Sequence, residues 1–206
     1  MTLRTTALLC NVLVVSQNIF VNRVHFNALL KQFYPLVLTS IPTAFIGGMI
    51  HLEKSSYLGL LGGTLVSTAV LMIIQLKAKK TAPLKRLSSV YFLIIGSGVG
   101  FLSGLVGIGG GIFLSPILFL GNIEEAKHIR IIASFFILAN SLSGLLGLWI
   151  SKQFVFDVEI LFPLLGVVFL GGIAGNLLGS NRFHPQLVKG ITALLILYAG
   201  LKVLFT

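Results

Sequence analysis

Three consecutive glycines, Gly109 to Gly111, interrupt the longest apolar stretch of the chain, and Pro116 follows them closely. Glycines carry a large helix penalty, whereas a proline suits the first turn of a helix, so this spacing predicts a new helix after the break. The first amides of such a helix lack intrahelical acceptors and lie at the positive end of its dipole. The amides of Gly109 to Ile112 would therefore suit an oxyanion; the alternative is that the glycines only form a tight turn against a neighbouring helix.

Amide and hydroxyl side chains inside the apolar stretches are the second source of candidate ligands. An amide that faces lipid is costly, so Asn11 and Asn140 are expected to face the interior of a helical bundle. For Asn140 the sequence leaves open whether it lines a site or forms an interhelical hydrogen bond, and for Ser115 the alternative is capping of a helix turn. The residues predicted to line the anion site are Gly107, Gly109, Gly110, Gly111, Ile112, Ser115, Pro116, Asn140, Ser141 and Asn11.

Other kinds of chemistry lack the residues that they need. The four histidines lie in charged segments or at the ends of apolar stretches, and none pairs at the spacing of metal ligands, so neither a metal nor a cofactor is predicted. Ser103 has no histidine or lysine at membrane depth to activate it, which argues against a hydrolase. A single cysteine, Cys10, excludes a disulfide framework. The sequence thus predicts that the protein is not an enzyme.

The composition indicates which elements must position the candidate site. Of the 206 residues, 10% are charged and 56% are hydrophobic, whereas a soluble domain carries about 25% charged residues. The chain is therefore predicted to be an all-α, polytopic membrane protein, with the bilayer as its surroundings. The predicted single spans cover 5–22, 32–50, 55–76, 131–151, 160–181 and 190–206.

The net charge of +10 is concentrated between the predicted spans. The basic run from Lys77 to Arg86 lies between two apolar stretches, which favours a cytoplasmic loop facing anionic lipid over a nucleic-acid site. No nucleic-acid partner is therefore predicted.

The apolar stretch from Leu87 to Ile123 is too long for one span. Its 37 residues would make a helix of about 55 Å, against a hydrocarbon core of about 30 Å. We predict a hairpin: a helix at 90–107, the glycine turn, and a short helix at 112–121 that returns to the cytoplasmic side. With this hairpin eleven Lys and Arg residues lie inside and four outside, whereas a single crossing gives nine against six, so the positive-inside rule favours the hairpin.

Internal similarity predicts a repeat on either side of the hairpin. Leu9-Cys10-Asn11 parallels Leu138-Ala139-Asn140 at an offset of 129. The segment that contains the pair Gly47-Gly48 likewise parallels the segment that contains the pair Gly171-Gly172. With the hairpin in place the two sets of three spans run in opposite directions, as in inverted-repeat transporters. The predicted units are a partial first repeat at 1–76, a basic loop at 77–89, and a complete second repeat at 90–206. Two glycine stripes are predicted to be packing surfaces: Gly96, Gly100 and Gly104, and Gly171, Gly175 and Gly179.

The run GLVGIGGGIFLSP, Gly104 to Pro116, with the pairs Ala133-Ser134 and Asn140-Ser141 after it, resembles the TauE/SafE family of membrane transporters. That family looks like two repeats, each opened by such a glycine motif, and is associated with export of sulfite and organosulfonates. The resemblance implies a multi-pass protein of a bacterial cell membrane that carries small anions. The first copy of the motif is missing before Thr5.

The missing motif leaves two interpretations open. One is a truncated chain whose natural form has a further hairpin. If the natural chain has no further hairpin, another copy or another chain is expected to fill the place of that hairpin. The alternative is a divergent member that acts as a non-transporting membrane subunit.

Overall fold

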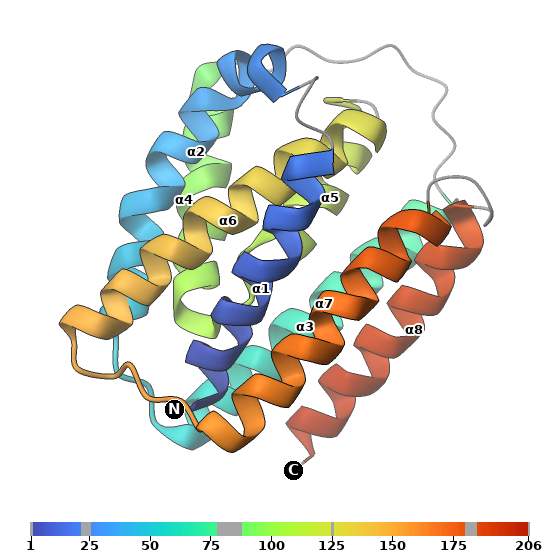
Figure 1. The fold of residues 1–206 in the computed structure, drawn as a ribbon. Coiled ribbons are helices and arrows are strands. Elements are labelled where there is room, and N and C mark those ends of the chain that lie inside the picture. Colours follow the sequence, from blue (N-terminus) through green and yellow to red (C-terminus); the bar gives the residue numbers. More distant parts are fainter. Residues whose placement is uncertain (1, 22–25, 78–87, 125, 180–184, 206) are drawn as a thin grey trace.

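The computed structural model describes residues 2–21, 26–77, 88–124, 126–179 and 185–205. Within these residues the chain forms eight α-helices and no strand (Figure 1). The helices are α1 (Thr2–Val21), α2 (Phe26–Met49), α3 (Lys54–Lys77), α4 (Ser89–Val106), α5 (Gly111–Leu120), α6 (Ala126–Ile150), α7 (Val158–Gly179) and α8 (Pro185–Leu204). Each predicted span forms a helix within the described residues, whereas positions 22, 180, 181 and 206 of these spans lie outside the described part. The stretch of 37 residues is divided at the glycines as predicted.

The outer surface of the bundle is apolar, whereas polar groups are buried in its interior. Phe162 and Val167 on α7 are 67% and 69% exposed, while Asn140 on α6 is completely buried. Such a surface suits lipid rather than water. Six of the described helices are long and apolar enough to cross a membrane. These features confirm a polytopic helical membrane protein.

The buried core surrounds the glycine hairpin. Phe92, near the start of α4, belongs to the same apolar cluster as Leu118 in α5 and Ile123 just beyond it. The cluster also contains Phe33 of α2 and Phe136 of α6. The start of α4 and the end of α5 thus belong to one cluster, and both ends of the hairpin reach the same end of the bundle (Figure 1).

The side of the membrane on which the hairpin ends is predicted from charge and can be measured. A cysteine at Asn122, placed in a Cys10→Ser background, is expected to react with an impermeant thiol reagent only after the cells are permeabilised. A cysteine at Lys152, at the opposite end of the bundle, is expected to react in intact cells and serves as the control. Labelling of Asn122→Cys from outside intact cells would contradict the predicted orientation.

The first glycine stripe brings two helix backbones into direct contact. Gly96, Gly100 and Gly104 on α4 face the backbone carbonyls of Leu36, Ser40 and Ala44 on α2, where a Cβ atom would overlap the carbonyl oxygens. Both sets of residues recur every four positions, so the two helices keep one register along the contact. The predicted packing role of this stripe is confirmed, since only residues without a side chain allow so close an approach.

Two glycines of α4 offer a matched test of this contact. At Gly100 an added Cβ would lie 2.6 Å from the Ser40 oxygen, whereas at Gly98 it would meet nothing within 4 Å. Gly100→Ala is expected to lower the free energy of unfolding by about 1–3 kcal/mol through overpacking. Gly98→Ala should leave it unchanged or raise it slightly, because alanine is the better helix former. Unfolding of the purified protein in mixed micelles measures both, and equal effects would contradict the role of the contact.

The second stripe does not pack within the described chain. At Gly171 and Gly175 an added Cβ would meet nothing within 4 Å, so their predicted contact with another helix is wrong for this fold. Gly172 makes the close approach instead, against the side chain of Gln17 on α1. The surroundings of Gly179 lie outside the described part.

The helix packing has the correspondence that an inverted repeat requires, with one asymmetry. Helix α1 packs on α7 as α6 packs on α2, and the pairs α1–α6 and α3–α8 each join equivalent helices. The asymmetry lies at the hairpin, because α4 packs on α2 and α6. No described helix covers the position beside α7 that is equivalent to that of α4. In the apolar segment of α7, 6% of the residues are buried, against 67% in that of α6.

Candidate functional site

Four residues connect α4 to α5, and three of them adopt backbone angles that favour glycine. Gly107, Gly109 and Gly110 have φ angles of +82°, +79° and +76°, in the left-handed region where other residues are strained. Gly107 ends α4 by donating its N–H to the Ser103 carbonyl at 2.8 Å. The chain reverses between Gly107 and Gly110, and α5 begins immediately afterwards.

The turn lies deep within the bundle. Helix α5 has 10 residues and is therefore about 15 Å long, half of a hydrocarbon core of about 30 Å. The first turn of α5 points away from the end of the bundle at which α4 begins and α5 ends. The free amides and the positive dipole end of α5 are thus presented near the middle of the bundle.

Side chains from three helices surround the glycines. A Cβ on Gly109 would lie 3.0 Å from Ser141 Oγ on α6 and 3.1 Å from Asn11 Nδ2 on α1. A Cβ on Gly110 would lie 3.1 Å from Ser103 Cβ on α4. Polar side chains from α1, α4 and α6 therefore converge on the turn, and a side chain at Gly109 or Gly110 would occupy their meeting point.

Several of these polar atoms have no hydrogen-bond partner among the described residues. They are Ser103 Oγ, Ser141 Oγ, and both Oδ1 and Nδ2 of Asn140, and all three residues are 0% exposed. Phe136 contacts the Gly110 position, and Asn140 lies one helical turn after Phe136 on α6. A buried polar atom without a partner costs about 1–3 kcal/mol, and such atoms are rare in folded proteins. We call Ser103, Asn140, Ser141 and the neighbouring Asn11 the polar cluster.

The polar cluster can donate hydrogen bonds to a ligand but supplies no negative charge. Serine hydroxyls and asparagine amides are neutral donors, and no carboxylate belongs to the cluster. Together with the first amides of α5, these donors suit an anion that arrives without its hydration shell. Among the described acidic residues Glu124 is the buried one, and it lies beyond the far end of α5, where its Oε1 is 3.0 Å from His128 Nδ1.

The structure brings together part of the set of residues that the sequence singled out. Gly109, Gly110, Ser141 and Asn11 meet at the turn, and Asn140 precedes Ser141 on α6. The alternative for Asn140, an interhelical hydrogen bond, is not formed within the described residues, since both of its polar atoms lack partners.

The remaining predicted residues have local roles. Ser115 donates its hydroxyl to the Gly111 carbonyl at 2.9 Å, so it bonds within α5 rather than capping its first turn. Pro116 is buried in the core, and Gly111 packs against Ile137. Ile112 lies in the first turn of α5, where its amide can contribute to a site. Gly107 lies at the start of the turn, against the backbone of Arg4.

Two residues near the turn were not predicted as site residues. Ser103 has a buried hydroxyl without a partner among the described residues. Its position on an apolar helix, one turn before the glycine turn, is the feature of the sequence that could have identified it. Arg4 was counted among the outer loop charges, but it lies in α1 and is 3% exposed. Its guanidinium donates to the carbonyls of Gly104 at 2.6 Å, Gly47 at 3.0 Å and Ile50 at 3.1 Å.

Comparison with known proteins places the chain in a family. The profile described as "Sulfite exporter TauE/SafE" matches residues 2–203. The "Probable membrane transporter protein y4hK" of Sinorhizobium fredii is 30% identical over 183 residues, which cover 85% of this chain and 71% of that relative. The "Probable membrane transporter protein YjnA" of Bacillus subtilis is 28% identical over 190 residues, covering 82% and 71% respectively. No solved structure is significantly similar to the chain.

The match extends over nearly the whole chain and includes every described helix. The two relatives are bacterial proteins named as probable membrane transporters, and the apolar helices agree with a multi-pass protein of the bacterial cell membrane. This chain belongs to the TauE/SafE family of membrane transporters.

Proposed function

We propose that the protein carries small anions such as sulfite or organosulfonates across the cell membrane, and that it holds the anion at the break from Gly109 to Gly111. The observation that supports this proposal is the polar cluster: buried hydroxyl and amide donors without partners, beside the amino end of α5. Family membership supports transport, and the description of the family names sulfite.

The electrostatics of the cluster favour an anion over a cation. Carboxylates are the usual countercharge for a cation in a membrane interior, and the cluster has none. The serine hydroxyls and the asparagine side-chain amides can accept as well as donate, but the backbone amides at the start of α5 only donate and carry partial positive charge. An anion with several acceptor oxygens would satisfy the orphan donors in one step.

Counterflow in proteoliposomes tests the proposal. Vesicles loaded with unlabelled sulfite are expected to accumulate radiolabelled sulfite from outside, and external methanesulfonate should compete. Protein-free vesicles and vesicles with an unrelated helical membrane protein provide the background. Counterflow at the background level, from protein that remains folded and monodisperse, would contradict transport.

One observation favours a second candidate, a non-transporting membrane subunit. Helix α7 is almost entirely uncovered, and its glycines Gly171 and Gly175 face no other part of the described chain. A subunit that binds another chain along α7 would have such a face. This candidate would be supported if the folded protein alone gave no counterflow and gave counterflow once a partner chain was added.

A further inference from the structure

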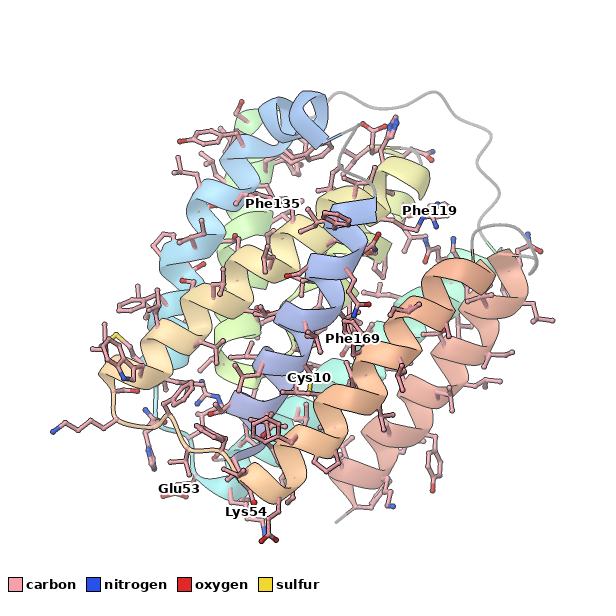
Figure 2. All side chains as sticks on the ribbon, in the orientation of Figure 1. Cys10, Glu53, Lys54, Phe119, Phe135 and Phe169 are labelled. Carbon is pink, nitrogen blue, oxygen red and sulfur yellow. The ribbon has the colours of Figure 1, made fainter. Side chains whose placement is uncertain are left out.

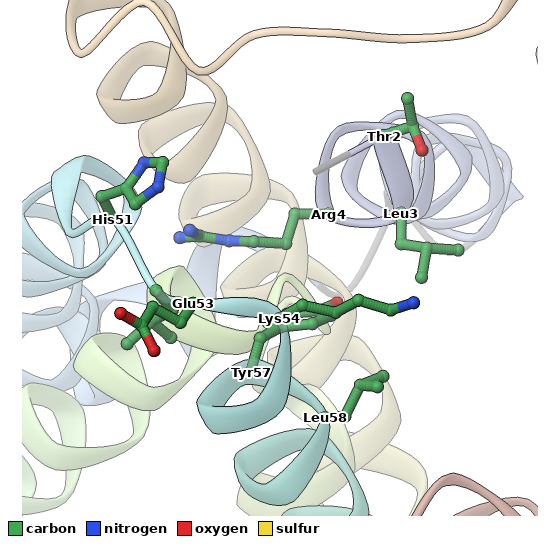
Figure 3. A pocket seen from close by; sticks show the side chains of 9 residues that line it. Thr2, Leu3, Arg4, His51, Glu53, Lys54, Tyr57 and Leu58 are labelled. Atoms are coloured by element: carbon green, nitrogen blue, oxygen red, sulfur yellow. The ribbon is translucent and has the colours of Figure 1, made fainter. Parts of the chain in front are cut away.

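A cavity of about 430 Å³ opens at the end of the bundle that contains the start of α1. Its wall is formed by the first turn of α1, the connection between α2 and α3, and the first turns of α3 (Figure 3). The polar residues lining it are Thr2, Arg4, His51, Glu53, Lys54 and Tyr57. This end, where Glu53 and Lys54 lie, is opposite to the end of the bundle near Phe119, at the end of α5 (Figure 2).

Arg4 is the buried residue of this cavity. Figure 3 shows its side chain extending from α1 across the space towards the connection that contains His51. The terminal nitrogens bind the last carbonyls of α2 and the Gly104 carbonyl of α4, with Nη2 also 3.4 Å from the Gly48 oxygen. Nε is buried and has no partner among the described residues.

The charge of Arg4 is only partly compensated. Carbonyls at the carboxyl ends of helices carry partial negative charge and stabilise a cation, but they leave the net charge in place. In the described part no salt bridge joins Arg4 to an acidic side chain, although Glu53 lines the same cavity and is exposed. A buried charge without a counter-charge is costly, so an anion in the cavity would lower the cost of burying Arg4.

Arg4 also adjoins the glycine turn. Its backbone packs against Gly107, at the start of the turn, and Asn11 contacts the Gly109 position. Arg4 and Asn11 are seven residues apart on α1, which places them on one face of the helix and about 10 Å apart along its axis. The cavity therefore ends at Arg4, two helical turns from the polar cluster.

We propose that this cavity is an anion-binding vestibule of the transporter, and that the charge of Arg4 attracts the anion there. The inference rests on the proposed function, because it gives the anion of the polar cluster an entry or exit site. A sulfonate or sulfite group would be attracted by the uncompensated charge of Arg4 and has oxygens that can accept from Lys54, at the cavity wall. The rival interpretation is that Arg4 only caps α2 and α4, in which case the cavity has no preference for anions.

Thiol labelling with reagents of opposite charge separates the two interpretations. Leu58 lines the cavity, and Val155 is an exposed residue at the same end of the bundle that does not line it. Each is replaced by cysteine in a Cys10→Ser background, in purified protein in detergent. The reagents are the anionic sulfonatoethyl and the cationic trimethylammonioethyl methanethiosulfonates, which react with thiols by the same chemistry.

The measured quantity is the ratio of the anionic to the cationic labelling rate. At Leu58→Cys this ratio should exceed that at Val155→Cys by about tenfold, since one unit charge a few ångströms away attracts one reagent and repels the other. Methanesulfonate should protect Leu58→Cys and leave Val155→Cys unaffected. Arg4→Gln should bring the two ratios together, while Arg4→Lys, which keeps the charge, should retain most of the difference.

Each outcome decides the proposal. In protein that still contains Arg4, equal ratios at the two positions would overturn the proposal, and so would a lack of protection by methanesulfonate. This test remains valid even if Arg4→Gln fails to fold. An unchanged ratio in folded Arg4→Gln would overturn the role of Arg4. Counterflow is measured separately: transport without an anion preference at Leu58→Cys refutes the vestibule alone, and an anion preference without transport refutes the proposed function alone.

Discussion

Gly110→Val is expected to abolish sulfite counterflow, with a loss of at least about a hundredfold, while the protein still inserts into the membrane. The backbone at Gly110 has a φ of +76°, which a β-branched residue strongly disfavours. An added Cβ would also lie 2.9 Å from the Phe136 ring and 3.1 Å from Ser103 Cβ. The valine would therefore displace the turn and separate the α5 amides from the polar cluster.

The control is Gly98→Val, which adds the same side chain to α4 at a position with no neighbour within 4 Å. It should transport at close to the parental rate. Transport is expressed per folded protein, measured by size-exclusion chromatography, so that a lower yield of Gly110→Val is not counted as lost activity. Parental transport by Gly110→Val would show that the glycine turn is not the site.

Asn140→Leu is expected to lower transport at least about tenfold and at the same time to make the protein more stable. Both polar atoms of the Asn140 side chain are buried without partners, and leucine has a similar size. Removing an unsatisfied buried group relieves a cost of about 1–3 kcal/mol, so the free energy of unfolding should rise by that order. A ligand that hydrogen-bonds to the amide would lose its partner.

The opposite signs of the two effects make this variant informative. If Asn140 formed an interhelical hydrogen bond, its replacement by leucine would lower stability. Unfolding in mixed micelles and counterflow are measured on the same preparation. Asn18, which donates to the Ser134 hydroxyl at 3.0 Å, is the matched control, since Asn18→Leu should lower stability.

The hairpin could be predicted from the sequence because its evidence is local. A stretch of 37 residues exceeds the membrane thickness, three glycines mark its break, and the loop charges favour a return to the same side. The first glycine stripe was predictable for the same reason, since a four-residue spacing places Gly96, Gly100 and Gly104 on one face of a helix. The second stripe has the same spacing but no partner in the described chain, so spacing alone does not determine what a stripe packs against.

Arg4 could not be recognised, because its environment is made by distant segments. An arginine at the beginning of an apolar stretch is typical of a loop, and nothing nearby in the sequence marks it as buried. Its acceptors, Gly47, Ile50 and Gly104, lie 43, 46 and 100 residues away. The orphan state of Ser103 and Asn140 likewise depends on which groups the fold places around them, and it cannot be inferred from residue type.

The contact between α2 and α4 restricts how the protein can move. Gly96, Gly100 and Gly104 each lie against a backbone carbonyl of α2, and a carbonyl cannot change rotamer to accommodate sliding or rotation of one helix against the other. These two helices must then travel as one rigid body, and the hinge of any rocking motion has to lie elsewhere. The α3–α8 pair has few contacts with α4 and α5 by comparison, which makes it the natural second body. Spin labels on α2 and α4 should keep a constant separation through the transport cycle, while the separation between α4 and α8 changes.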